Sequence, residues 1–202
     1  MPESTSAQTR IIEAAKRLFA ERGTAEVSVS ELSQAAGVAR GTIYNNFPAP
    51  ENLFHEIVAR LAQDMHERIA MAGETPRDPA RCLANGLRYF VRQAHEEPIW
   101  GRFVLRFAFS NSALQGMWNG QPAIDLLAGQ ASGRYRFDIT QAPSMLAMIA
   151  GCGLSAMFMV LEGHRTWRDA GSDAAEFALR ALGIAEDEAR TIANTELPPL
   201  SK

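Results

Sequence analysis

The sequence predicts an all-α fold, in which a small N-terminal unit of three helices is followed by a larger helical domain. Apolar residues recur at spacings of three and four through nearly the whole chain of 202 residues. Strand signals are almost absent, since only residues 135–139 alternate briefly. Residues 73–79 form the clear linker of the first half. We therefore expect one unit at 7–52 and another at 77–196, joined by a helix over 50–73.

The first helix is predicted from the apolar periodicity of residues 11–19, and Gly23 is a natural C-terminal cap. Ser28 and Glu31 have the spacing of a capping box, in which each side chain binds the other's free backbone amide. A second, short helix therefore begins there. Gly37 permits the tight turn between crossing helices, and a third helix follows from about residue 39 to residue 46.

The fourth helix is predicted to begin at Pro50, because proline suits the first helical position, and to end near Gly73. Three apolar stripes indicate further helices in the second half. These stripes are Leu83, Leu87, Phe90, Val91 and Ala94; Ile99, Phe103 and Phe107; and Ile124, Leu127, Ala128 and Ala131. Helices over 143–168, 172–182 and 185–194 complete the chain.

Residues 139–161 carry no charge and are long enough to span a bilayer. This segment contains polar and helix-weakening residues, and no cluster of lysine or arginine flanks it. We expect a helix that is buried on all sides and no membrane contact.

The bulk properties indicate a cytoplasmic protein. The N-terminus is polar and has no apolar leader, and Cys82 and Cys152 are too far apart for a zinc or redox motif. The net charge is −3, and residues 1–50 hold five basic and five acidic side chains. Overall charge therefore does not attract nucleic acid, so any DNA contact must be local.

Residues 11–54 resemble the DNA-binding domain of the TetR family of bacterial repressors. The matching positions are Ala14, Ala15, residues 18–23, 28–32, 35–38 and 41–44, Phe47, Leu53 and Phe54. The resemblance implies a helix-turn-helix domain, followed by a ligand-binding and dimerisation domain. It also implies a ligand-responsive repressor that binds palindromic, double-stranded operator DNA as a homodimer.

The third helix would then present short polar side chains to the major groove, while Leu32, Ile43 and Phe47 pack inward. Arg40, Asn45 and Asn46 suit base edges or phosphate, and Thr42 suits a hydroxyl contact or a thymine methyl. In this family the position of Tyr44 commonly binds phosphate, and Ser28 is a second candidate. Gly41 would permit close approach to the DNA. The predicted DNA-binding residues are Ser28, Arg40, Gly41, Thr42, Tyr44, Asn45 and Asn46.

The resemblance also implies an apolar cavity in the larger domain for a small hydrophobic or aromatic effector. Its candidate lining residues are Trp100, Phe103, Phe107, Met148 and Phe158. In the uncharged helix Ala147, Gly151 and Ser155 fall four apart and permit a close helix contact, which in this family lies between subunits. The predicted dimer contact is Ala147, Gly151, Leu154, Ser155, Phe158, Phe177, Ala178, Ala181 and Leu182.

Catalytic and metal motifs are absent from the sequence. The histidines at positions 55, 66, 95 and 164 have no metal-ligand spacing, and no nucleophile elbow or phosphate loop occurs. We expect neither enzyme activity nor a cofactor. The alternative function is a helical protein that binds a small molecule or lipid and uses its N-terminal unit to bind a protein.

Overall fold

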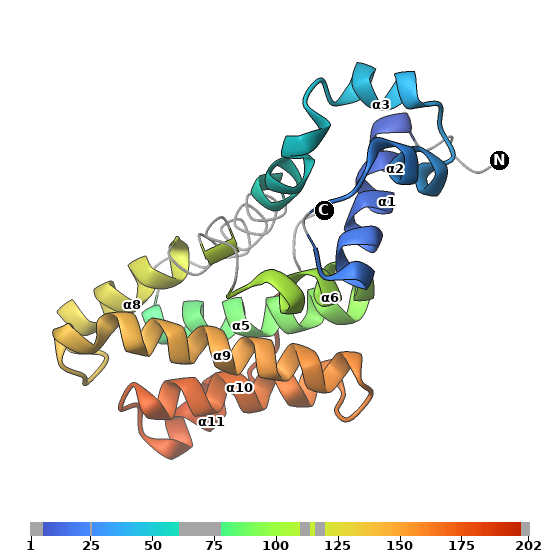
Figure 1. The fold of residues 1–202 in the computed structure, drawn as a ribbon. Coiled ribbons are helices and arrows are strands. Elements are labelled where there is room, and N and C mark those ends of the chain that lie inside the picture. The colour runs from blue at the N-terminus through green and yellow to red at the C-terminus, as the bar shows by residue number, and fades with distance from the viewer. Residues whose placement is uncertain (1–5, 25, 61–77, 110–113, 116–119, 199–202) are drawn as a thin grey trace.

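The computed structural model describes residues 6–24, 26–60, 78–109, 114–115 and 120–198, and within these ranges the regular elements are all helices. The N-terminal part contains α1 (Ala7–Arg22), α2 (Val29–Ala36), α3 (Arg40–Asn46), the short 3₁₀ turn η1 (Pro50–Asn52) and helical residues 53–60. The larger part contains α5 (Pro79–Glu96), α6 (Pro98–Phe107), α8 (Gln121–Ala131), the 3₁₀ turn η2 (Ile139–Gln141), α9 (Ala142–Leu161), α10 (Trp167–Ala181) and α11 (Glu186–Asn194). In Figure 1 α1–α3 lie at one end of the molecule, and α9 and α10 run side by side along its opposite edge.

The predicted caps define the N-terminal helices. Gly23 ends α1 with φ +68°, and its N–H donates to the carbonyl of Phe19. Both hydrogen bonds of the capping box between Ser28 and Glu31 are present, and Gly37 ends α2 with φ +63°. Pro50 occupies the start of η1, which continues into helical residues 53–60. The predicted end of that helix at Gly73 and residues 73–77 of the linker lie outside the described residues.

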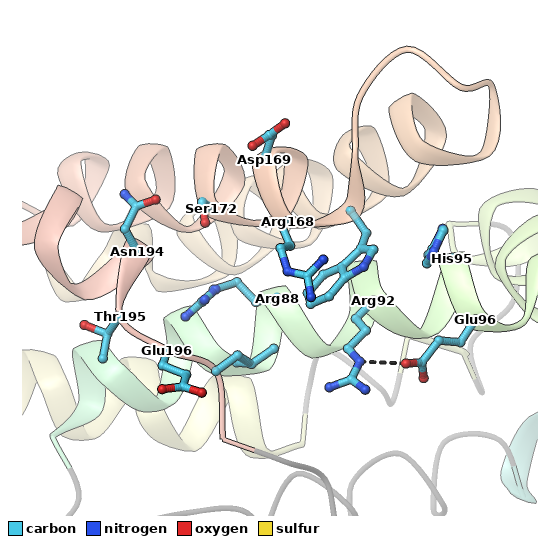
Figure 2. Close-up of a pocket in the computed structure, with 12 residues that line it drawn as sticks. Arg88, Arg92, His95, Glu96, Arg168, Asp169, Ser172, Asn194, Thr195 and Glu196 are labelled. Carbon is cyan, nitrogen blue, oxygen red and sulfur yellow. Dashed lines mark hydrogen bonds and ion pairs between the residues drawn. The ribbon is translucent and has the colours of Figure 1, made fainter.

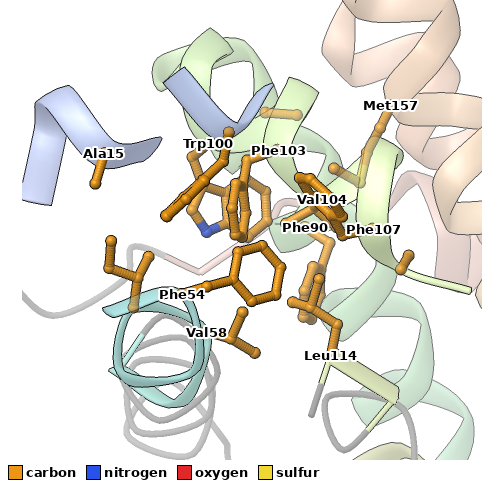
Figure 3. Packing of buried hydrophobic residues seen from close by; sticks show 14 of the residues in the cluster. Ala15, Phe54, Val58, Phe90, Trp100, Phe103, Val104, Phe107, Leu114 and Met157 are labelled. Carbon is orange, nitrogen blue, oxygen red and sulfur yellow. The ribbon is translucent and has the colours of Figure 1, made fainter. Parts of the chain in front are cut away.

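Two apolar clusters form the core. One joins α10 and α11 to α5, α8 and α9. The other joins α1–α3 and residues 53–58 to α6. At its centre the rings of Phe54 and Phe107 pack edge-on with their centres 4.9 Å apart (Figure 3). The ring of Phe19 also packs edge-on with Phe54, at 5.1 Å between ring centres. The N-terminal helices therefore share a packed core with the larger part.

The predicted boundary between the helices over 143–168 and 172–182 lies in the wrong place. α9 ends at Leu161, and Gly163 adopts φ +74°, a conformation that favours glycine. The hydroxyl of Thr166 then accepts a hydrogen bond from the N–H of Asp169 and caps α10, which begins at Trp167 rather than near Ser172. The prediction was wrong here because it carried the helix through the polar residues 162–166, which contain both the glycine turn and the threonine cap.

The predicted apolar stripe of α8 also lies on the wrong face. Ile124 is 59% exposed and Leu127 47% exposed, whereas Leu126 and Gly129 are buried. A methyl group added to Gly129 would lie 2.1 Å from the ring of Tyr135. The ring of Tyr135, outside the helix, therefore packs against the glycine side and decides which face of α8 is buried.

The expectation that the uncharged helix is buried on all sides was wrong for the isolated chain. α9 buries one face, including Ile149 and Met157, and exposes Ala147, Ser155 and Phe158. By length and composition residues 139–161 qualify as a membrane span, with 33% of the most apolar window buried. An apolar face of α9 is thus left uncovered by the rest of the described chain.

Candidate nucleic-acid interface

The α2–α3 pair holds its inner side in a small core and presents its outer side to solvent. Ile43 is fully buried and Phe47 is 1% exposed, and both pack in the same cluster as Leu32 and Phe19. These anchors place Arg40, Gly41, Tyr44 and Asn45 on the exposed side of α3. The tyrosine is 53% exposed, which is unusual for so large a ring.

Three of the predicted DNA-binding side chains already have partners within the chain. The Nη2 of Arg40 donates to the hydroxyl of Ser30, 2.7 Å away on α2. The side-chain amide of Asn46 donates to the carbonyl of Thr42, 2.8 Å away, and both residues are half-buried. Arg40 is exposed and can exchange its weak surface contact for a phosphate, whereas Asn46 stabilises the end of α3.

Ser28 is the third and most constrained of them. Its hydroxyl donates to the Oε2 of Glu31 at 2.8 Å and accepts from the backbone N–H of the same glutamate. The other carboxylate oxygen of Glu31 pairs with Arg22 at 2.7 Å. Hydrogen bonds from Ser28 and then from Arg22 lower the pKa of Glu31 to about 2. A phosphate at Ser28 would therefore have to compete with the carboxylate of Glu31 for the hydroxyl.

Neither the packing of the described chain nor the backbone conformation requires a glycine at position 41. A methyl group added to it would meet no atom within 4 Å, and its φ is not in the left-handed region. Glycine inside a helix costs about 1 kcal/mol relative to alanine. The missing side chain therefore leaves room on the outer surface of the helix, where another molecule can approach the backbone.

The predicted dimer residues fall into two groups. Ala147, Ser155, Phe158, Phe177 and Ala181 are exposed and Gly151 is half-buried, so these six are available on the surface of α9 and α10. A groove of about 470 Å³ runs between the two helices beside Gly151, Ser155 and Phe177. Leu154, Ala178 and Leu182 instead lie in the subunit's own core, at 6%, 0% and 0% exposure. These three side chains therefore offer little surface to a second subunit, and their place in the predicted dimer contact stays a prediction.

The five predicted ligand-binding residues do not meet in one place. Trp100, Phe103 and Phe107 are buried in the cluster that joins α6 to α1 and residues 53–58 (Figure 3). Met148 lines the groove between α9 and α10, and Phe158 is 51% exposed on α9. Sequence reasoning missed that the first three connect the DNA-binding helices to the larger part, since only the tertiary contact with Phe19 and Phe54 shows it.

The comparisons with known proteins agree with this arrangement. A family model described as "Tetracyclin repressor-like, C-terminal domain" matches residues 78–195. A second model, described as "Bacterial regulatory proteins, tetR family", matches residues 11–57. The chain belongs to the TetR family. The match to the C-terminal model spans more than half of this TetR-family chain.

Curated relatives and solved structures extend the comparison. The HTH-type transcriptional regulator EthR of Mycolicibacterium smegmatis is 27% identical over 59% of this chain and 55% of its own length. The regulator TtgR of Pseudomonas putida is 34% identical over 40% of this chain and 39% of its own. The chain thus matches about half or less of these relatives' length.

Among solved structures, RolR in complex with resorcinol superposes with a TM-score of 0.71 and 29% identity, covering 96% of both chains. A TetR-like transcriptional regulator from Rhodococcus sp. RHA1 gives a TM-score of 0.69 at 17% identity, over 92% of this chain and 100% of that one. The second likeness shows the fold alone. The two family-model matches and the RolR match over 96% of the chain favour a regulator over a helical lipid-binding or small-molecule-binding protein.

Proposed function

We propose that this chain is a cytoplasmic transcriptional repressor that binds a two-fold symmetric operator as a homodimer and is released by a small hydrophobic or aromatic effector. In this proposal residues 7–52 bind DNA, and residues 77–196 bind the effector and the second subunit. One observation carries it: α3 is anchored by buried Ile43 and Phe47 and exposes Arg40, Tyr44 and Asn45 on its outer side. A helix of this kind fits the major groove.

The charge of the N-terminal part supports the need for two subunits. Its equal numbers of basic and acidic residues give little attraction to phosphate, so a single copy binds DNA weakly. The exposed face of α9 and α10 supports a homodimer, because Phe158 and Phe177 are 51% and 58% exposed there and exposed apolar side chains that lie together are typical of a protein contact. Two copies of α3 then bind two half-sites.

The aromatic cluster supports the coupling between effector and DNA. Phe103 and Phe107 of α6 lie 5.5 and 4.9 Å from the ring of Phe54, which itself packs on Phe19 of α1. A shift of α6 in a close-packed core therefore moves the DNA-binding helices with it. Release still requires that the effector bind the DNA-free form more tightly than the DNA-bound form.

A gel shift with operator DNA selected from a random pool tests the DNA-binding role. Tyr44→Ala should weaken binding to all sequences alike, because the tyrosine is expected on phosphate. Asn45→Ala should relax the preference at one base pair, at a cost of about 1–3 kcal/mol. Wild-type protein that selects no sequence would overturn the proposal, and the reverse pattern would exchange the two roles.

The effector class is tested with resorcinol, the ligand in the RolR structure. We expect a small hydroxylated aromatic compound of this kind to release the operator from wild-type protein. Intrinsic tryptophan fluorescence with and without operator DNA measures the two affinities. Equal affinities in the two states would contradict an inducing role for that compound.

A further inference from the structure

A second hollow lies far from α3, between α5, α10 and the C-terminal residues 194–197. It has a volume of about 610 Å³, within the range of sites for small molecules. Its lining includes three arginines, Arg88 and Arg92 of α5 and Arg168 of α10 (Figure 2). The proposed DNA-binding surface and the α9–α10 face share none of these residues.

Arg88 is the unusual member of this groove. Its side chain is buried, with 8% of the residue exposed, and the ion pairs of the described part of the chain do not include it. Within the described residues its guanidinium makes one hydrogen bond, in which Nη1 donates to the Oδ1 of Asn85 on the same helix at the long distance of 3.5 Å. Arg134, by contrast, pairs with Asp78 at 3.0 Å and Glu188 at 2.8 Å. A buried guanidinium without a carboxylate is costly, and burial lowers the pKa of Arg88.

The packing explains how Arg88 is held in place. A methyl group added to Gly171 of α10 would lie 3.5 Å from both the Cα and the Cγ of Arg88. An alanine would thus fit here at ordinary contact distance, and α10 packs directly against the base of the arginine side chain. The hydroxyl of the neighbouring Tyr89 donates to the carbonyl of Pro198 at 2.9 Å, which fastens the C-terminal residues across α5.

The other two arginines are organised by Trp167. Arg168 lies 4.5 Å and Arg92 5.5 Å from the centre of the indole ring. Arg92 is also paired with Glu96 at 2.7 Å, so part of its charge is neutralised. Asp169, which also lines the groove, accepts a hydrogen bond from the hydroxyl of Thr166 at 2.9 Å. The remaining carboxylate, Glu196, forms no ion pair with a described residue and borders the groove.

We propose that this groove binds a small ligand that carries an oxyanion, either an organic acid or a phosphate ester, and that Arg88 binds its charged group. The planar guanidinium offers parallel N–H donors that match a carboxylate or a phosphate. Such a ligand supplies the counter-charge that the described chain lacks. The groove contains none of the residues predicted to bind the effector or DNA.

Calorimetric unfolding of the full chain with two anionic probes, inorganic phosphate and benzoate, tests the site. Chloride at equal ionic strength and neutral benzyl alcohol are the reference solutes. We expect at least one anion to raise the Tm of wild-type protein and of the control Arg81→Met, an exposed arginine on the same helix. Arg88→Met should lose this rise and weaken binding about tenfold or more. A rise with phosphate alone assigns a phosphate ligand, and a rise with benzoate alone assigns a carboxylate.

Without the anion, Arg88→Met should unfold at no lower temperature than wild type, because it removes an unpaired buried charge. No rise with either anion, or the same rise in Arg88→Met, would overturn the proposal. If that variant does not fold, Glu196→Gln decides. Removing the carboxylate beside the groove should tighten anion binding, and unchanged or weaker binding would count against the site.

Discussion

Gly41 shows how a single residue separates stability from function. The chain has open space beside it and no backbone strain, so glycine there lowers helix stability without an internal benefit. Gly41→Ala should raise the free energy of unfolding by about 0.5–1 kcal/mol and weaken operator binding, because the methyl group occupies the space next to the DNA. Urea unfolding and gel shifts measure the two effects.

Gly86→Ala is the matched control, since Gly86 is also inside a helix with open space around it. It should gain similar stability and leave DNA affinity unchanged. Operator binding by Gly41→Ala that equals wild type would show that α3 does not approach DNA on this side.

Glu31 gives the fold a dependence on pH. Its folded-state pKa of about 2 is below the ordinary value of 4.5, so its ionised form favours the folded state. This contribution is present above pH 4.5 and is lost as the pH falls toward 2. Glu31→Gln should therefore lower the Tm at pH 7, and the difference from wild type should shrink between pH 4.5 and 2.

Thermal unfolding across this pH range measures the effect. Glu26→Gln serves as the control, because Glu26 is exposed and forms no ion pair in the described part of the chain. A Tm difference for Glu31→Gln that stays constant down to pH 2 would contradict the assignment.

Residue-level prediction succeeded where the signal is local. The Ser28–Glu31 capping box and the turn at Gly37 involve residues within a few positions of each other, and both are present. The contact of Arg40 with Ser30, ten residues away, has no sequence signal. Nor does the burial of Arg88, which depends on α10 lying against it at Gly171.

At the level of elements, the face of a helix was harder to predict than its existence. α8 is present as expected, yet Tyr135 packs on Gly129 and leaves Ile124 and Leu127 exposed. The boundary between α9 and α10 was predicted several residues too late, because the turn at Gly163 and the cap at Thr166 were not used as signals of a helix end and a helix start. Periodicity identifies a helix, whereas the buried face depends on neighbours distant in sequence.

The exposed face of α9 and α10 carries a prediction about assembly. Phe177 is 58% exposed there, and Phe177→Asp would place a charge in the proposed apolar contact. We expect this variant to sediment as a monomer and to bind operator more weakly. Ile124→Asp, at 59% exposure on α8, should remain a dimer. A dimeric Phe177→Asp protein would contradict the α9–α10 interface.

For the whole molecule, the aromatic core that spans α1, residues 53–58 and α6 is the structural basis for a regulator whose two parts respond together. The sequence predicted two units joined by a helix. Three of the residues predicted to bind a ligand lie instead in the aromatic core that connects the two parts. Trp100, Phe103 and Phe107 were singled out for their size and softness, but those properties do not distinguish a cavity wall from a packed core.

The central claim is that two copies of α3 bind a symmetric operator, and footprinting on DNA selected from a random pool tests it most directly. The account predicts two inverted half-sites whose centres are about 34–36 Å apart, or a multiple of that distance. A single half-site protected by one copy of the chain would contradict it.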